Sequence, residues 1–180
     1  YIHGLEGNDT LKGGDGNDQI NTGSGEDHAF GESGDDNING VLNSAGTYTY
    51  SESSGTQWLY GGEGNDNIFG GTDVDNIEGG TGNDYLRGLE GNDTLKGGAG
   101  NDIIHPGDGI DSADGGAGDD TLNSYLKEGA KILHGGEGND TIWGGVDDDF
   151  IYGGDGDDQR LSGYAGNDTV YGGEGNDKLY

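Results

Sequence analysis

The chain has 180 residues, a formal net charge of −29, 44 glycines, no cysteine and a hydrophobic fraction of only 27%. This composition excludes a disulfide-stapled fold, and it leaves too little apolar surface to offset chain entropy unless metal ions or stacked repeats contribute. The acidic balance argues against nucleic acid or an anionic membrane as a partner and favours cations. No apolar run of 18 residues occurs, so we expect no membrane span.

A nine-residue period organises the chain from Gly4 onward. The units have the form G-G-x-G-N/D-D-x-U-x, where U is aliphatic, and residues 13–21 are a clean copy. A flexible glycine-rich linker would have no reason to keep this phase, so we expect an ordered stack of repeats. Sixteen copies are found: four in 4–39, seven in 61–123, three in 135–161 and two in 163–180.

Every copy has aspartate at its sixth position, and most have glycine at the first, second and fourth. These glycines permit left-handed or tightly turned backbone at low steric cost and leave carbonyl oxygens accessible. Carboxylates and carbonyls in such turns suit Ca²⁺, which takes roughly six to eight oxygen ligands in flexible geometry. The aspartates are Asp9, Asp18, Asp27, Asp36, Asp66, Asp75, Asp84, Asp93, Asp102, Asp111, Asp120, Asp140, Asp149, Asp158, Asp168 and Asp177.

This pattern resembles the RTX (repeats-in-toxin) calcium-binding family over 144 of the 180 residues. The resemblance implies an all-β fold, a right-handed parallel β-roll with two nonapeptides per coil and Ca²⁺ between successive turns on both edges. It also implies that each ion takes a carboxylate and two carbonyls from a loop and from the loop two repeats later. Asp9 should then pair with Asp27, and Asp18 with Asp36. The glycines expected among the metal ligands are Gly14, Gly16, Gly62, Gly64, Gly80, Gly82, Gly98, Gly100, Gly116, Gly118, Gly136 and Gly138.

Calcium should be needed for folding. Aspartates on coils about 4.8 Å apart would repel by about 3 kcal/mol per neighbouring pair at an effective dielectric of about 20. One core side chain per repeat, such as Ile20 or Leu86, does not offset the entropy of ordering nine residues. We therefore expect the calcium-free chain to be largely unfolded.

A longer repeat is superimposed on the short one. Residues 4–14 recur unchanged at 88–98, and a third copy of the unit begins at Gly163. In the sixth nonapeptide of the unit, Asp73 or Asp147 replaces the third glycine. We expect the chain to be a window on a longer array.

An irregular stretch follows the fourth nonapeptide of each long unit. The segments 58–60 and 132–134 resemble strand ends, which favours degenerate coils with bulged, calcium-free loops, while 47–50 is a candidate extra strand. Protruding loops that make lateral contacts are the alternative. We expect one continuous solenoid, with repeats at 1–39, an insert or degenerate coil at 40–60, repeats at 61–123, a second insert or degenerate coil at 124–134 and repeats at 135–180.

Local departures from the motif predict further details. One extra residue near 160–162 should put Leu161, rather than Arg160, in the core. Position nine faces outward and is often aromatic, which indicates either stacking between coils or a contact surface for neighbouring filaments or glycans. The second glycine is replaced by Leu5, Glu32, Leu89 and Tyr164, and the aromatic residues at position nine are Phe30, Tyr60, Phe69, Trp143, Tyr152, Tyr171 and Tyr180.

The sequence contains no nucleophile-elbow, zinc-protease or phosphate-loop motif, and the nine-residue period does not fit an EF-hand. We therefore expect no enzyme activity. We expect a calcium-rigidified structural segment of a secreted or cell-surface fibre, adhesin or surface-layer protein, with copies of itself or surface glycans as further candidate partners. The alternative is a calcium-dependent folding and secretion module of a secreted enzyme, such as an RTX protease, lipase or alginate epimerase. Ice binding is disfavoured because only Thr72 and Thr81 have threonine at position three.

Overall fold

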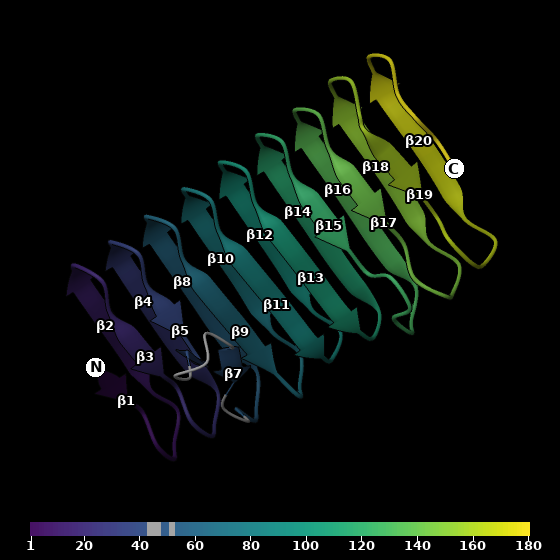
Figure 1. The fold of residues 1–180 in the computed structure, drawn as a ribbon. Helices are drawn as coiled ribbons and strands as arrows, with labels where there is room; N and C mark the ends of the chain where they lie inside the picture. Colours follow the sequence, from purple (N-terminus) through teal and green to yellow (C-terminus); the bar gives the residue numbers. More distant parts are fainter. Residues whose placement is uncertain (43–47, 51–52) are drawn as a thin grey trace.

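The structure is a computed structural model that describes residues 1–42, 48–50 and 53–180. All regular secondary structure in these residues is β-structure, and the strands stack along one axis from the N-terminus to the C-terminus (Figure 1). Most strands belong to two parallel sheets of nine strands each, which face one another.

The first sheet holds the strands that follow the loops of one edge. In spatial order they are β1 (Ile2–His3), β3 (Gln19–Asn21), β5 (Asn37–Ile38), β9 (Asn67–Gly71), β11 (Tyr85–Glu90), β13 (Ile103–Asp108), β15 (Thr121–Asn123), β17 (Thr141–Trp143) and β19 (Arg160–Ser162).

The second sheet holds the strands that follow the loops of the other edge. Its order is β2 (Thr10–Asp15), β4 (Asp27–Ser33), β8 (Gln57–Glu63), β10 (Asn76–Thr81), β12 (Thr94–Ala99), β14 (Asp111–Ala117), β16 (Lys131–Glu137), β18 (Phe150–Asp155) and β20 (Thr169–Glu174).

Each strand pairs with the strand one coil later. Ile77 of β10 lies opposite Leu95 of β12, and Leu86 of β11 lies opposite Ile104 of β13. Two nonapeptides therefore complete one coil, with one strand in each sheet and one loop at each edge. This confirms the predicted all-β, right-handed parallel β-roll.

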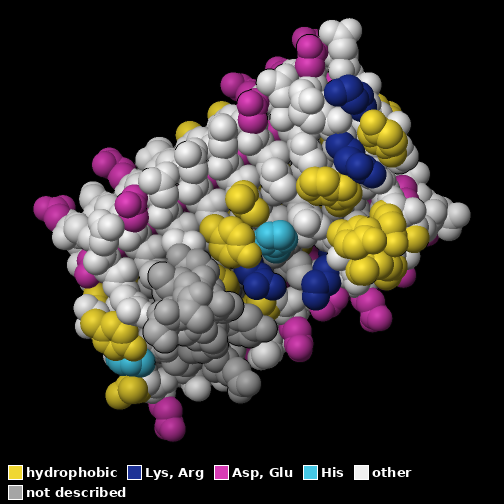
Figure 2. Space-filling view, in the orientation of Figure 1, with side chains coloured by type: hydrophobic (Ala, Val, Ile, Leu, Met, Phe, Trp, Pro, Cys, Tyr) yellow, Lys and Arg dark blue, Asp and Glu magenta, His cyan; other side chains and the backbone are white. Residues whose placement is uncertain are grey.

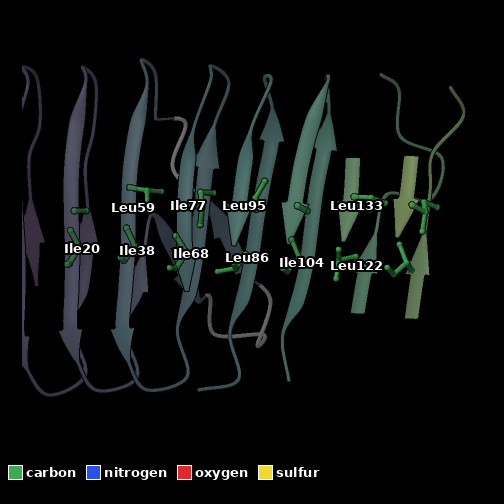
Figure 3. Packing of buried hydrophobic residues seen from close by; sticks show 14 of the residues in the cluster. Ile20, Ile38, Leu59, Ile68, Ile77, Leu86, Leu95, Ile104, Leu122 and Leu133 are labelled. Atoms are coloured by element: carbon green, nitrogen blue, oxygen red, sulfur yellow. The ribbon is translucent and has the colours of Figure 1, made fainter. Parts of the chain in front are cut away.

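The core is a narrow double row of aliphatic side chains between the two sheets (Figure 3). Each nonapeptide contributes the residue at its eighth position, so that Ile20 and Ile68 come from the first sheet and Leu59 and Leu133 from the second. All four are fully buried. Because strand residues alternate between the two faces of a sheet, the neighbouring positions seven and nine point outward.

The first irregular stretch interrupts one coil. Here β6 (Gly40–Leu42) and β7 (Tyr48–Tyr50) form an antiparallel pair outside the two large sheets. The candidate strand at 47–50 thus corresponds to β7, while Thr47 lies outside the described residues. The chain rejoins the roll at β8, where Gln57 lies opposite Asp27 of β4.

The second irregular stretch is shorter and also ends in register. After β15 the chain passes through a turn at 125–126 and enters β16, where Lys131 lies opposite Asp111 of β14. Segments 58–60 and 132–134, predicted as strand ends, lie within β8 and β16.

The prediction that Leu161 replaces Arg160 in the core is confirmed. Leu161 is fully buried and lies opposite Ile142, while Arg160 is exposed. The extra residue is absorbed by a bulge, because the backbone N–H groups of Gln159 and Arg160 both point at the Asp140 carbonyl, at 2.8 and 3.4 Å.

Outward aromatic residues stack between coils. The rings of Phe30 and Tyr60 lie 5.0 Å apart and within 6° of parallel, which is the offset stacking expected at position nine. Phe69 also points away from the core row, in register with Arg87, but unlike the other aromatic residues at position nine it is fully buried. Gly40 at the start of β6 lies against this ring, since a Cβ added to Gly40 would come within 2.6 Å of Phe69 Cε2.

We predict that Leu95→Ala lowers the free energy of unfolding of the calcium-saturated chain by about 2–5 kcal/mol, because it leaves a cavity in a core one side chain deep. Chemical denaturation followed by circular dichroism measures the change. Lys96→Ala on the exposed face of the same strand is the matched control and should change stability by less than about 0.5 kcal/mol. Equal effects of the two substitutions would contradict this description of the core.

Candidate metal centre

The loops of the roll form two stacks, one at each edge. We name the edges by the residues at the sixth position of their nine loops. The loops of the first edge lead into the strands of the second sheet, and the loops of the second edge lead into the strands of the first sheet. The first edge has Asp9, Asp27, Gln57, Asp75, Asp93, Asp111, Lys131, Asp149 and Asp168. The second edge has Asp18, Asp36, Asp66, Asp84, Asp102, Asp120, Asp140, Asp158 and Asp177.

The aspartates of each edge form a ladder. The backbone N–H of one aspartate donates to Oδ1 of the aspartate in the next coil, as from Asp66 to Asp84 and from Asp84 to Asp102, each at 2.8 Å. The predicted pairs are brought together in the same way, at 2.8 Å for Asp9 with Asp27 and 2.7 Å for Asp18 with Asp36. All sixteen predicted aspartates belong to one of the two ladders. The remaining rungs join Asp36–Asp66, Asp75–Asp93, Asp93–Asp111, Asp102–Asp120, Asp120–Asp140, Asp140–Asp158, Asp149–Asp168 and Asp158–Asp177.

The second oxygen of most of these carboxylates has no hydrogen-bond donor. A buried carboxylate oxygen without a donor is strongly unfavourable unless a cation faces it. A row of such oxygens along both edges therefore fits a row of cations. The Oδ2 atoms concerned are those of Asp9, Asp27, Asp36, Asp66, Asp84, Asp93, Asp102, Asp120, Asp140 and Asp158. Asp111 Oδ2 is faced instead by the ammonium of Lys131, at 3.1 Å.

The glycine at position one leaves space directly in front of this oxygen. A Cβ added to Gly97 would lie 2.2 Å from Asp102 Oδ2 and 2.5 Å from the carbonyl oxygen of Gly115 in the next coil. The same pair of contacts recurs at Gly79, where the distances are 2.3 Å to Asp84 Oδ2 and 2.7 Å to the Gly97 carbonyl. Loops with glycine at position one thus keep open a small cradle between a carboxylate and a carbonyl, which are the oxygen ligands that Ca²⁺ prefers.

The twelve glycines predicted among the ligands all adopt left-handed backbone, with φ between +102° and +132°. At Gly100 a Cβ would lie 1.9 Å from the carbonyl oxygen of Gly82, so the coil spacing itself requires glycine there. Four copies keep positive φ at position two without glycine, at strain that their packing must offset. These residues are Leu5 (81°), Glu32 (80°), Leu89 (83°) and Tyr164 (74°).

Main-chain oxygens must supply much of any coordination shell. Within the described part of the chain, no three acidic, histidine or cysteine side chains converge into a metal-binding group. Two carboxylates from successive loops and the carbonyls of their glycine turns form the donor set that the repeats offer. This set is all oxygen and is suited to a hard divalent cation such as Ca²⁺.

Burial changes the acidity of the ladder carboxyls. It raises the pKa of Asp93 to about 8, and the nearby Asp75 and Asp111 carboxylates add to the shift. It likewise raises the pKa of Asp84 and of Asp120 to about 7. The backbone N–H bonds of the ladder only partly oppose this effect. Without a cation, the fold therefore disfavours the charged form of its own ladder.

The sequence motif missed two sixth-position residues. Gln57 and Lys131 occupy position six in two first-edge loops, and all the remaining loops of that edge have aspartate there. The strand-like segments 58–60 and 132–134 could have revealed them. These segments occupy positions seven to nine of a nonapeptide, so the residue just before each one is at position six. Both side chains are fully or almost fully buried.

Stacked turns with paired carboxylates and facing carbonyls define a cation-binding parallel β-roll. A model of the RTX calcium-binding nonapeptide repeat (4 copies) matches residues 1–29, 22–40, 53–86, 78–113, 107–125, 128–159 and 160–180. The chain therefore belongs to the RTX calcium-binding repeat family, and its repeats bind Ca²⁺ at multiple sites between turns. A comparison with curated proteins gave no match.

The described residues include no helix long and apolar enough to cross a membrane.

We predict that the calcium-free chain gains β-structure on acidification. Asp66, Asp84 and Asp93 ionise near pH 4 in an unfolded chain, whereas burial in the fold raises their pKa to about 6, 7 and 8. These groups therefore stabilise the metal-free fold fully below about pH 4, and this stabilisation is lost as the pH rises from about 4 to about 8. Far-UV circular dichroism of metal-free protein should show more β-structure at pH 4 than at pH 8. A stronger signal at pH 8 would contradict the prediction.

We predict that Asp84→Ala removes or weakens two calcium ions, because its loop lies between two neighbours on the second edge. Isothermal titration calorimetry measures the number of ions and their affinity. Asp114→Ala is the matched control, since Asp114 is an exposed acidic residue outside both ladders. Unchanged stoichiometry and affinity in Asp84→Ala would count against sites shared between successive loops.

Proposed function

We propose that the chain is a calcium-binding structural segment of a secreted fibre, adhesin or surface-layer protein, folded and rigidified by Ca²⁺. The ladder aspartates and the carbonyls of the glycine turns are its ligands, with each ion between successive loops of one edge. The observation that supports this proposal best is the row of buried carboxylate oxygens without donors along both edges. No other group in the described loops could neutralise them all, because the whole chain has only seven lysines and arginines.

The proposed role depends on the free calcium concentration at which the ladder carboxylates are neutralised. At low free calcium, repulsion within the ladders opposes folding, so the chain stays extended. At the higher calcium concentrations outside cells, each ion joins two coils and stabilises the roll by mass action. A chain with this behaviour is suited to export in an unfolded state and to folding at or beyond the cell surface.

A structural role is favoured over catalysis by the way the acidic residues are used. The buried carboxylates are already engaged in ladders that repeat every coil. The long unit, which has seven motif copies and one nonapeptide with Gln57 or Lys131 at position six, occurs in two successive versions. A folding and secretion module of a secreted enzyme remains the second candidate. A catalytic domain in the parent protein would favour that candidate, and many further copies of the long unit would favour the fibre.

The outer face of the first sheet is the candidate contact surface. Hydrophobic, basic and histidine side chains gather in the middle of the face seen in Figure 2, and acidic side chains lie along its margins. A cavity of about 330 Å³ is lined in part by Arg87, His105, Tyr125 and Lys127. Aromatic and cationic groups of this kind suit surface glycans or an acidic edge of another copy of the chain.

Calcium titration tests the proposal. We expect metal-free protein at pH 7.5 to be expanded, with a radius of gyration of about 45 Å, and to become compact at about 20 Å or less when calcium is added. The midpoint should lie at about 0.1–1 mM free calcium, in the range of extracellular modules. Small-angle X-ray scattering and circular dichroism measure the transition, and magnesium is the control ion. A chain that is fully folded in chelator at pH 7.5 would contradict calcium-dependent folding.

A further inference from the structure

The ammonium group of Lys131 is enclosed within the first-edge loop stack. The side chain is fully buried, and Lys131 lies opposite Asp111 in the position where the ladder would otherwise continue with aspartate. A buried lysine is rare unless its charge is matched by oxygen ligands. The contacts of its Nζ therefore show what this place in the stack binds.

Nζ of Lys131 has only oxygen partners. It donates hydrogen bonds to the carbonyls of Glu128 at 2.7 Å and Gly129 at 2.8 Å, and also to the carbonyl of Gly109. Its fourth neighbour is Asp111 Oδ2, at 3.1 Å. Gly109 and Gly129 are the fourth-position glycines of two successive loops. The ammonium thus lies between the same carbonyls and carboxylate that the repeats offer to an ion.

Gln57 occupies the equivalent place one long unit earlier. Its Nε2 donates to the carbonyls of Gly25 and Gly55, each at 2.9 Å. These are again the fourth-position glycines of two successive first-edge loops. The amide supplies hydrogen bonds without a formal charge, whereas Lys131 also balances the charge of Asp111.

The loop that follows each replacement is also different. Both oxygens of Asp149 accept backbone hydrogen bonds, Oδ1 from Lys131 N–H at 2.7 Å and Oδ2 from Gly145 N–H at 2.5 Å. Both oxygens of Asp75 do the same, Oδ1 from Gln57 N–H at 2.8 Å and Oδ2 from Gly71 N–H at 2.6 Å. Neither carboxylate keeps an oxygen that requires a cation.

The unusual fourth-position aspartates complete this arrangement. Asp147 Oδ2 accepts from Gly129 N–H at 2.7 Å, and Asp73 Oδ2 accepts from Gly55 N–H at 2.9 Å. Each therefore joins its own loop to the preceding loop that lacks aspartate. In each long unit, the loss of aspartate at position six of one first-edge loop is thus accompanied by a gain of aspartate at position four of the next loop, and a hydrogen bond joins the two loops.

We propose that Lys131 and Gln57 are built-in replacements for calcium, and that each forms, with the loop that follows it, a metal-free step in the first-edge ladder. The proposal rests on the proposed calcium role of the aspartate ladders. Nine loops on each edge leave sixteen gaps between successive loops, and twelve of these have aspartate on both sides. The wild-type chain should therefore bind at most twelve ions in its ladders.

Lys131→Asp tests the proposal, because it restores the repeat motif. We expect one additional calcium ion per chain, in the gap between the loops of Asp111 and residue 131. The next gap stays metal-free, because both oxygens of Asp149 already accept backbone hydrogen bonds. Calorimetry and metal analysis of the calcium-saturated protein after gel filtration measure the number of ions. Gln57→Asp should add one ion independently, which keeps the test decisive if one variant fails to fold. Lys96→Asp, the same change of charge on the exposed face of β12, is the matched control and should leave the number of ladder ions unchanged.

Two further readouts separate ion replacement from simple packing. Lys131→Gln should fold with the wild-type ion count, because it reproduces the Gln57 arrangement, whereas Lys131→Met should lower the Tm of the calcium-saturated protein without adding an ion. In wild type, nuclear magnetic resonance should detect slowly exchanging ammonium protons on Lys131. Folded Lys131→Asp and Gln57→Asp variants with the wild-type ion count would overturn this inference, while a wild-type chain that binds no calcium would instead overturn the proposed function.

Discussion

A carboxylate oxygen held inside the protein without a donor is the feature on which this structure depends. The ladder of backbone N–H bonds positions Oδ1 of each aspartate and leaves Oδ2 facing a gap between coils, as at Asp84 and Asp102. Burial then raises the pKa of these groups, so their ionisation near neutral pH destabilises the metal-free fold. A cation in the gap satisfies the oxygen, removes the repulsion between coils and joins them.

The other parts of the roll are arranged around this requirement. Glycine at position one keeps the gap open, and glycine at position four lets the carbonyl of the preceding coil come close, as at Gly97 and Gly100. The strands are short because only one residue in nine needs to reach the core. We expect the core, with one row of side chains from each sheet, to be too thin to hold the sheets together without calcium at the edges. The loops, which in most folds are the least constrained segments, would then determine the stability of the roll.

Much of this could be predicted from the sequence because the repeat is strict. The period defined the repeat, and the resemblance to the RTX family implied two nonapeptides per coil. The strand register and the pairing of Asp9 with Asp27 and of Asp18 with Asp36 follow from that number. Leu161 was predicted correctly because an aliphatic residue next to a charged one shows where the phase slips.

The rest depends on contacts between segments that no local pattern describes. Phe69 has the position of an outward residue, yet it is buried because β6 lies over the roll at that point. Lys131 was not recognised as part of the ladder because a motif built on aspartate gives no weight to a residue of opposite charge. Its register with Asp111 and the carbonyls around its ammonium are visible only in the structure, and they are the basis for the proposed replacement of an ion.

The number of nonapeptides in the long unit has a geometrical consequence. Counting the nonapeptide that contains Gln57 or Lys131, the long unit has eight nonapeptides. Because this number is even, the unit makes four whole coils. Both irregular stretches therefore leave the roll at the same point of the coil, after β5 and after β15 in the first sheet. With coils about 4.8 Å apart, the two departures are separated by about 19 Å along one flank. A unit of seven or nine nonapeptides would have placed them on opposite flanks. The even number of nonapeptides in the long unit thus places both irregular stretches on the flank of the first sheet.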